Sequence, residues 1–215
     1  MAPERWKGED RIMEKDSVKG TKTCGGTGSV SKAHSSTGTA GKACEAPKAA
    51  EDYIRKALEM GADHAVFFRT GDIEFDPRSL LKCMFGCSSW GKDHTCPSRP
   101  GSLKPWEYEQ IFRRYSWGII IHSHNKKTSQ EISFAIESQA FTDGYYMAFS
   151  LSDCSICPEC GGRKGLPCAD PRKARPAFHS VGIDVFKTVR KFGLPIETLK
   201  SGSDEQNWYS AVFIE

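Results

Sequence analysis

Seven of the nine cysteines gather in two short stretches, and this clustering limits what the chain can fold around. The stretch 154–168 is CSICPECGGRKGLPC, and its cysteines are Cys154, Cys157, Cys160 and Cys168. The stretch 83–97 is CMFGCSSWGKDHTCP, and its cysteines are Cys83, Cys87 and Cys96. Cytosolic thiols stay reduced, so such clusters in a cytoplasmic protein indicate a metal centre rather than disulfide bonds.

The rest of the composition argues for a cytoplasmic protein. A formal net charge of +3 over 215 residues is too small to indicate a nucleic-acid partner. No stretch approaches the roughly 18 apolar residues of a membrane span, and the start, MAPERWKGEDR, lacks the apolar centre of an export signal. We therefore expect cytoplasmic localisation, with no membrane and no nucleic-acid partner.

The composition changes near residue 48. Residues 15–48 are rich in Gly, Ser, Thr, Lys and Ala and show no apolar periodicity, which is typical of segments that stay disordered. We predict a flexible, low-complexity N-terminal tail over 1–48 and an iron–sulfur domain over 49–215. Cys24 and Cys44 fall in the tail, either as incidental thiols or as additional metal ligands.

Beyond residue 48, helical and extended patterns alternate. Apolar residues recur at helical spacing in 48–61, 102–115, 128–141 and 179–193. Strands are expected in 64–75 (alone or as a hairpin turning at 70–72), 116–124, 145–152, 196–201 and 208–215. This order predicts an α/β or α+β fold, with a mixed sheet flanked by helices and two cysteine-rich cluster-binding loops.

The spacing C-x2-C-x2-C-x7-C of the second set favours a [4Fe–4S] cluster. Three cysteines at intervals of three let a short loop ligate three irons, and the fourth ligand comes from further along the loop or the fold. Zinc prefers two well-separated cysteine pairs. Five cations lie between Cys160 and Pro176, namely Arg163, Lys164, Arg172, Lys173 and Arg175. They could compensate the charge of the cluster, form a docking patch or belong to an ordinary solvated loop.

The first set, C-x3-C-x8-C, supplies three thiols and leaves three interpretations open. A second [4Fe–4S] cluster could take Cys24, Cys44 or His94 as its fourth ligand. It could instead keep one iron open for a small ligand, in a pocket around Trp90, His94 and Arg99. Alternatively, His94 could complete a zinc site with the three cysteines.

The other histidines give weaker signals. His122 and His124 end an apolar strand, and we interpret them as marking where that strand meets water. His64 precedes a strand. His179 follows the second set, where it could contact a metal-ligating residue without binding the metal itself.

Both cysteine sets, together with the stretch ARPAFHSVGIDV at 174–185, resemble a known family. Its members are described as predicted metal-binding proteins, a domain of unknown function found mostly in anaerobic bacteria and archaea. The resemblance covers residues from about 50 to 215 and implies an oxygen-sensitive iron–sulfur protein of anaerobic metabolism, without implying a reaction. Ser98 stands where the family tends to have a second proline, and His179 stands where a glutamate is usual.

Three functions follow from this reading. The leading one is electron transfer, or a redox adaptor role with a redox partner protein, through one or two [4Fe–4S] clusters. The alternative is an enzyme that binds and activates a small ligand at an open iron of the first cluster. A zinc-stabilised interaction module is the weaker third.

Overall fold

The computed structural model describes residues 46–215. Cys24, Cys44 and most of the predicted tail lie outside these residues, so the tail and the two extra ligands stay predictions. The helices of the described part are α1 (Lys48–Glu59), α2 (Ser79–Gly86), α3 (Pro105–Phe112), α4 (Lys126–Thr142) and α5 (Val185–Lys191). Its strands are β1 (His64–Arg69), β2 (Trp117–Ser123), β3 (Phe149–Leu151) and β4 (Trp208–Phe213). No helix among residues 46–215 has the length and apolar character needed to cross a membrane.

The strands form one sheet in the order β1-β2-β4-β3, and each neighbouring pair is antiparallel. His64 pairs with His122, Ser123 with Trp208 and Leu151 with Ala211. The starts of β1 and β4 and the ends of β2 and β3 therefore meet at one end of the sheet. We call this the His122 end, and the second cysteine set follows β3 directly from it.

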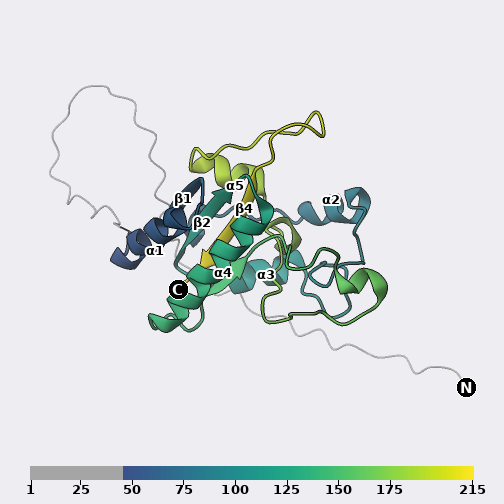
Figure 1. Cartoon of the computed structure of the whole chain (residues 1–215), viewed down its shortest axis with the longest axis horizontal. Helices are drawn as coiled ribbons and strands as arrows, with labels where there is room; N and C mark the ends of the chain where they lie inside the picture. The colour runs from purple at the N-terminus through teal and green to yellow at the C-terminus, as the bar shows by residue number, and fades with distance from the viewer. Residues whose placement is uncertain (1–45) are drawn as a thin grey trace, which may run out of the picture. The chain divides into compact units, whose positions relative to one another are not determined.

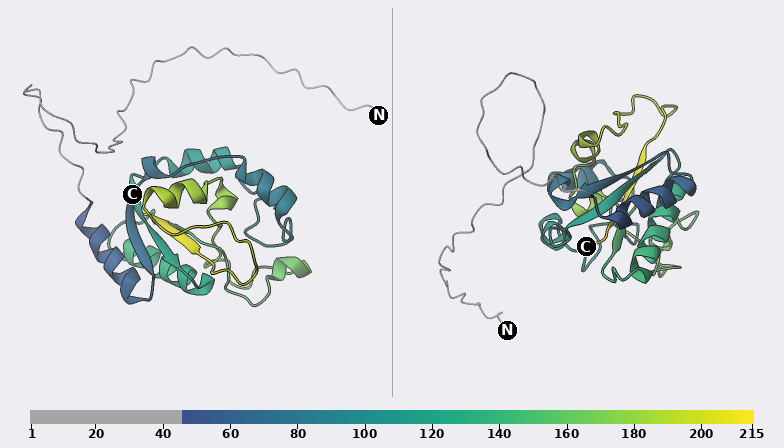
Figure 2. Two further views of the ribbon diagram at one scale, coloured as in Figure 1. Left: turned by 90° about the horizontal axis from the view of Figure 1, so that it is seen from above. Right: turned by 90° about the vertical axis from the view of Figure 1, so that its left-hand side faces the viewer.

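Helices cover both faces of the sheet. Helices α1 and α4 lie on one face, and α3 and α5 lie on the other (Figures 1 and 2). Along β2, Ile119 and Ile121 pack toward α1 and α4, while Ile120 packs into the opposite cluster. All residues of β2 are buried, so its unbroken aliphatic run reflects coverage on both faces rather than parallel pairing.

The predicted α/β character, with a sheet flanked by helices, is confirmed, although the sheet is antiparallel throughout rather than mixed. The helix expected over 179–193 is divided in two. Gly182 has φ +92°, and a Cβ there would lie 2.7 Å from Cβ of Pro105. Helix α5 begins only after Asp184, whose carboxylate accepts a hydrogen bond from the Lys187 N–H at 2.9 Å and so caps the helix.

Of the two alternatives for 64–75, the structure has the single strand. Strand β1 ends at Arg69 and is followed by the short 3₁₀-helix Thr70–Asp72, so no hairpin forms. The strand expected over 196–201 is wrong, because these residues form no strand.

Backbone bonds join the segment before α2 to the segment before α5. Phe75 forms an isolated antiparallel bridge with Ile183. The Asp76 N–H donates to Gly182 O at 2.7 Å, and the Asp184 N–H donates to Glu74 O at 2.8 Å. Helix α2, which carries the first cysteines, is therefore held against the segment that follows the second cysteine set.

We predict that Gly118→Ala lowers the free energy of unfolding by about 1–3 kcal/mol through overpacking. A Cβ at this position of β2 would lie 2.1 Å from Val212 O and 2.5 Å from Cζ of Phe68. Gly71→Ala is the control, because a Cβ there meets nothing within 4 Å. Chemical denaturation measures both variants, and equal stability of the two would contradict the packing described for β2.

Candidate metal centre

Helix α2 positions the first two cysteines. Cys83 lies within the helix and is buried, at 7% exposure. Cys87 is the C-cap residue and is exposed; its N–H donates to Cys83 O at 3.2 Å. Residues four apart on a helix share one side, so both thiols face the same region.

A series of turns brings Cys96 back toward α2. The Trp90 N–H donates to Cys87 O at 3.1 Å, and the Cys96 N–H donates to Asp93 O at 3.1 Å. The Cys96 sulfur accepts the Gly91 N–H at 3.2 Å and lies 3.0 Å from Ser98 Oγ. Two polar groups thus stabilise negative charge on this sulfur, which favours the thiolate form that metals bind.

Hydrogen bonds to helix α4 hold the start of the second cysteine set. The amide and hydroxyl of Ser155 both donate to Gln130 Oε1 on α4, at 2.7 and 3.1 Å. The short 3₁₀-helix Gly161–Lys164 follows the third cysteine, and Gly165 ends it with φ 70°. The Leu166 N–H then donates to Gly161 O at 2.9 Å, which closes a compact turn before Cys168.

The two cysteine loops pack directly against each other. The His94 N–H points to Cys160 Sγ at 3.5 Å, and His94 Nε2 lies 2.8 Å from Leu166 O. Arg163 donates to Asp93 Oδ1 at 2.7 Å and to Ser89 Oγ at 2.8 Å. The predicted cluster-binding loops therefore form one region, and His94 lies at their contact.

Gly162 is required at this contact. A Cβ on Gly162 would lie 2.4 Å from Lys92 O and 3.2 Å from the His94 backbone nitrogen. The backbones of the two loops can approach this closely only because the residue is glycine.

Most of the cations after Cys160 are neutralised by acids. Four of the five form ion pairs, namely Arg163 with Asp93 at 2.7 Å, Lys164 with Glu159 at 2.5 Å, Lys173 with Asp170 at 3.6 Å and Arg175 with Glu137 at 2.5 Å. Arg172 alone of the five has no ion pair within residues 46–215. These residues therefore do not form a strongly basic docking patch.

The pKa of Cys83 depends on its burial and on the other two cysteines of the first set. Burial, and after it the nearby Cys87, Cys96 and Asp153, which disfavour another negative charge, together raise the pKa of the Cys83 thiol to about 11. The hydrogen bonds from Arg163 hold the pKa of Asp93 below its usual range. Cys83 is thus a neutral thiol at physiological pH until a cation replaces its proton.

The seven cysteines between residues 46 and 215 are free thiols. They lie on helix α2 and in two loops that pack against each other, and backbone amides donate to two of the sulfurs. Soft thiolate ligands select iron–sulfur clusters, zinc or copper(I). The donor set therefore fits a sulfur-ligated metal centre.

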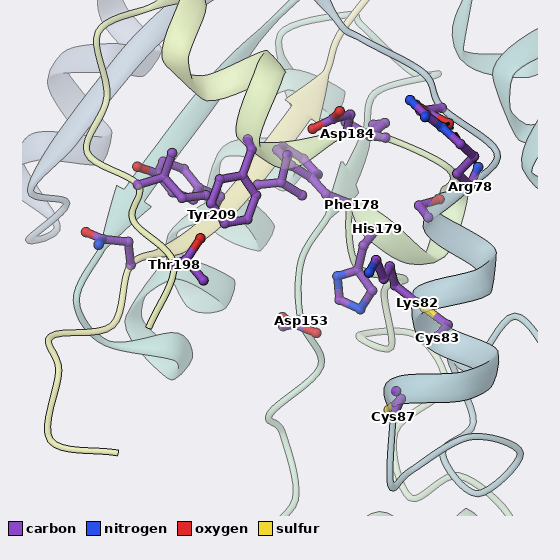
Figure 3. Close-up of a pocket in the computed structure, with 18 of the residues that line it drawn as sticks. Arg78, Lys82, Cys83, Cys87, Asp153, Phe178, His179, Asp184, Thr198 and Tyr209 are labelled. Carbon is purple, nitrogen blue, oxygen red and sulfur yellow. Dashed lines mark hydrogen bonds and ion pairs between the residues drawn. The ribbon is translucent and has the colours of Figure 1, made fainter. Parts of the chain in front are cut away.

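A cavity of about 980 Å³ adjoins the first cysteine set. Cys83 and Cys87 line it from α2, Asp153 lines it from the segment after β3, and His179 lines it from the segment before α5 (Figure 3). Its apolar lining comes mainly from the segments around α5 and β4, including Phe178, Ile183, Val185, Phe186, Ile196 and Tyr209. Trp90, His94 and Arg99, around which we expected a pocket, do not line this cavity.

Apart from the thiols of Cys83 and Cys87, three ionisable side chains in this cavity have no ion pair or hydrogen bond within the described residues. They are Lys82, Asp153 and His179. Sequence analysis identified only His179; Lys82 and Asp153 directly precede Cys83 and Cys154, and this adjacency was the signal that could have pointed to them.

Comparison with family models identifies the chain. Residues 66–214 match the model described as predicted metal-binding protein (DUF2284), and the chain belongs to this family. The family resemblance inferred from the cysteine sets is thereby confirmed. Searches of the curated proteins and of the solved structures find no match.

We predict that Cys83 in metal-free, folded protein reacts with iodoacetamide at pH 8 at least about tenfold more slowly than Cys87. Only the thiolate reacts, and a pKa raised from 9.0 to about 11 lowers the thiolate fraction roughly a hundredfold. Time-resolved alkylation followed by peptide mass spectrometry measures both rates. Denatured protein is the control, in which the two rates should converge; equal rates in the folded protein would refute the burial of Cys83.

Proposed function

We propose that the chain holds two [4Fe–4S] clusters and transfers electrons through them to or from a redox partner protein. Cys83, Cys87 and Cys96 would hold one cluster; the second would use Cys154, Cys157, Cys160 and Cys168. The observation that carries this proposal is the direct packing of the two loops, with the His94 N–H 3.5 Å from Cys160 Sγ. Two redox centres this close would exchange electrons readily.

The spacing of the sulfurs favours clusters over single zinc ions. Zinc bound tetrahedrally at about 2.3 Å places its thiolates roughly 3.8 Å apart. Among residues 46–215, no three cysteine sulfurs lie within 4.8 Å of one another. A cubane is larger than one ion and takes more widely spaced ligands, so the absence of such a compact group counts against zinc but not against a cluster.

The position of His94 bears on zinc at the first set. Its Nε2 atom lies 2.8 Å from Leu166 O and so carries the proton, which leaves Nδ1 with a lone pair that could bind a metal ion. Among residues 46–215, however, no group of three metal-ligand atoms within 4.8 Å of one another includes His94. A Cys3His zinc site would therefore require the first cysteine loop to rearrange.

The surroundings of the sulfurs would raise the reduction potentials of the clusters. The Gly91 N–H donates to Cys96 Sγ, and the Arg163 guanidinium interacts electrostatically with Cys160. Hydrogen bonds to sulfur and nearby positive charge both stabilise the more negative, reduced cluster. Because most of the loop cations are paired with acids, this effect would be moderate.

Helix α2 offers apolar rather than basic surface to a redox partner. Leu81, Met84 and Phe85 are exposed on it at 54%, 42% and 82%, and they alternate with the first cysteines along the chain. Large exposed apolar side chains grouped on one short element are typical of an interaction site. We therefore place docking of the redox partner at α2.

The cavity beside Cys83 and Cys87 favours a second candidate function, the binding of a small ligand at an open iron. The first set supplies three cysteines for the four irons of a cluster. The fourth iron could therefore lack a protein ligand and face this cavity. Lys82, Asp153 and His179 would then supply a positive charge, a carboxylate and an imidazole around the ligand. Such a site could use the iron as a Lewis acid.

We expect about eight irons and eight acid-labile sulfides per chain after anaerobic purification, because two cubanes contain that number. Cys87→Ala and Cys157→Ala should each reduce the iron content by about half. Ser88→Ala, next to Cys87, is the matched control and should keep the full content. An unchanged iron count in both cysteine variants would refute the assignment.

The EPR spectrum of the reduced protein tests the packing of the loops. Two reduced clusters at adjoining loops should show magnetic coupling, and Cys157→Ala should leave the simple spectrum of one isolated cluster. Uncoupled signals in a protein with eight irons would contradict the proximity of the two centres.

Cyanide separates the two candidate functions. If the first cluster has an open iron, cyanide should perturb the EPR signal that Cys87→Ala removes. Lys82→Ala should then weaken cyanide binding about 10- to 100-fold, the effect of losing one charge-assisted hydrogen bond. Lys127→Ala, on the exposed side of α4, is the control. No perturbation by cyanide would leave electron transfer as the function of both clusters.

A further inference from the structure

A second group of metal-ligand side chains lies at the His122 end of the sheet, apart from the cysteine sets. Asp63, His122 and His124 each offer one ligand atom, and these atoms all lie within 4.8 Å of one another. His64 lies outside this group of three, but its Nδ1 atom is 3.0 Å from Nδ1 of His122, so a shift of its side chain could bring in a further imidazole. The interpretation of His122 as a residue that meets water is wrong, because its side chain is completely buried.

We propose that Asp63, His64, His122 and His124 form a binding site for one divalent transition-metal ion of the zinc or iron(II) class. Three imidazoles and one carboxylate are the ligands that such ions prefer. Thiolate-bound iron–sulfur clusters use different donors, so this site is independent of the clusters proposed above.

The hydrogen bonds of His122 and His124 each occupy one ring nitrogen and leave the other free to bind a metal ion. His122 Nε2 lies 2.8 Å from Asn207 Oδ1, and His124 Nδ1 lies 3.2 Å from Gln206 O. Both oxygens accept, so these ring nitrogens carry the protons and the opposite nitrogens keep their lone pairs. Histidines that bind metals almost always donate their other N–H to an acceptor of this kind.

The contact between His64 and His122 has nearly the spacing of two ligands of one ion. Two nitrogens bound at about 2.0–2.1 Å to a tetrahedral zinc are roughly 3.3 Å apart. The observed separation of 3.0 Å requires a proton between the rings when no cation is bound. A metal ion could replace that proton with a shift of a few tenths of an ångström.

The backbone holds the carboxylate and the histidines in register. His64 and His122 are directly paired across β1 and β2. The Asp63 N–H donates to His122 O at 3.0 Å, and the His124 N–H donates to Asp63 Oδ2 at 2.9 Å. The ligands therefore belong to adjoining strand ends of a rigid sheet, which reduces the entropy lost on binding.

A zinc titration tests the site in the full chain with its native cysteine content. The anaerobic protein is dialysed against EDTA, and Zn²⁺ binding is measured by calorimetry and by metal analysis. The wild type should bind one zinc more per chain than the double variant His64→Ala/His124→Ala. Both residues are exposed, so the core should be unaffected, as circular dichroism and thermal melting can verify.

Two further variants separate ligation from indirect effects. Asn207→Ala should retain the site but weaken zinc binding about 10- to 100-fold, because it removes only the acceptor that orients His122. His179→Ala removes a histidine from the cavity beside the cysteines and should leave the additional zinc in place. Equal zinc stoichiometry and affinity in the wild type and the double variant would overturn the proposal.

Cobalt distinguishes this site from the thiols. One equivalent of Co²⁺ bound at the histidines should give d–d absorption without a thiolate charge-transfer band, and it should broaden the imidazole NMR signals of His64, His122 and His124. The double variant should lose both effects. Cobalt bound only with a thiolate charge-transfer band, and equally in both proteins, would assign all metal binding to the cysteines.

Discussion

Burial of β2 on both faces determines how the polar side chains at the end of this strand are paired. Because helices cover each side, the polar residues at the end of this strand have no access to water and must find partners inside the protein. His122 contacts His64 and Asn207, and Ser129 on α4 donates to Ser210 beside it. The same antiparallel pairing brings the ends of β2 and β3 to one end of the sheet, so the chain leaves β3 for the second cysteine set at the end of the sheet that carries the histidines.

Local patterns in the sequence predicted much of the fold, and long-range contacts account for the differences. Val181 and Val185 have helical spacing, yet the chain between them does not form a helix, because Gly182 adopts a positive φ against Pro105. Nothing in the local pattern indicates that contact. The cysteine spacing likewise predicted a metal centre, which the family supports. The packing of the two sets could not be predicted, since it depends on Arg163 and Asp93, which are 70 residues apart in the chain.

The cysteine loops have little regular structure of their own, so metal binding and loop folding should be coupled. The turn around Cys96 and the turn around Cys160 are each held by a few hydrogen bonds, and Cys83 must lose a proton that burial makes difficult to remove. The free energy of metal binding would supply what these contacts lack. Because Gly162 brings the two backbones together, an ordered second loop also restricts the first. Occupancy of one centre should thus favour occupancy of the other.

Two residues that contact His122, Asn207 and Tyr209, also line the cavity beside Cys83, and they link the proposed histidine metal site to the proposed ligand site. Asn207, which orients His122, lines the cavity beside Cys83, and Tyr209 does so as well, with its ring centroid 4.9 Å from that of His122. An ion at His122 would fix Asn207 and with it one side of the cavity. Coupling of this kind is reciprocal: if the ion tightens ligand binding in the cavity, the ligand tightens ion binding by the same factor. A metal ion at the sheet end could therefore adjust the ligand site beside the first cysteine set without contacting either the ligand or the cysteines.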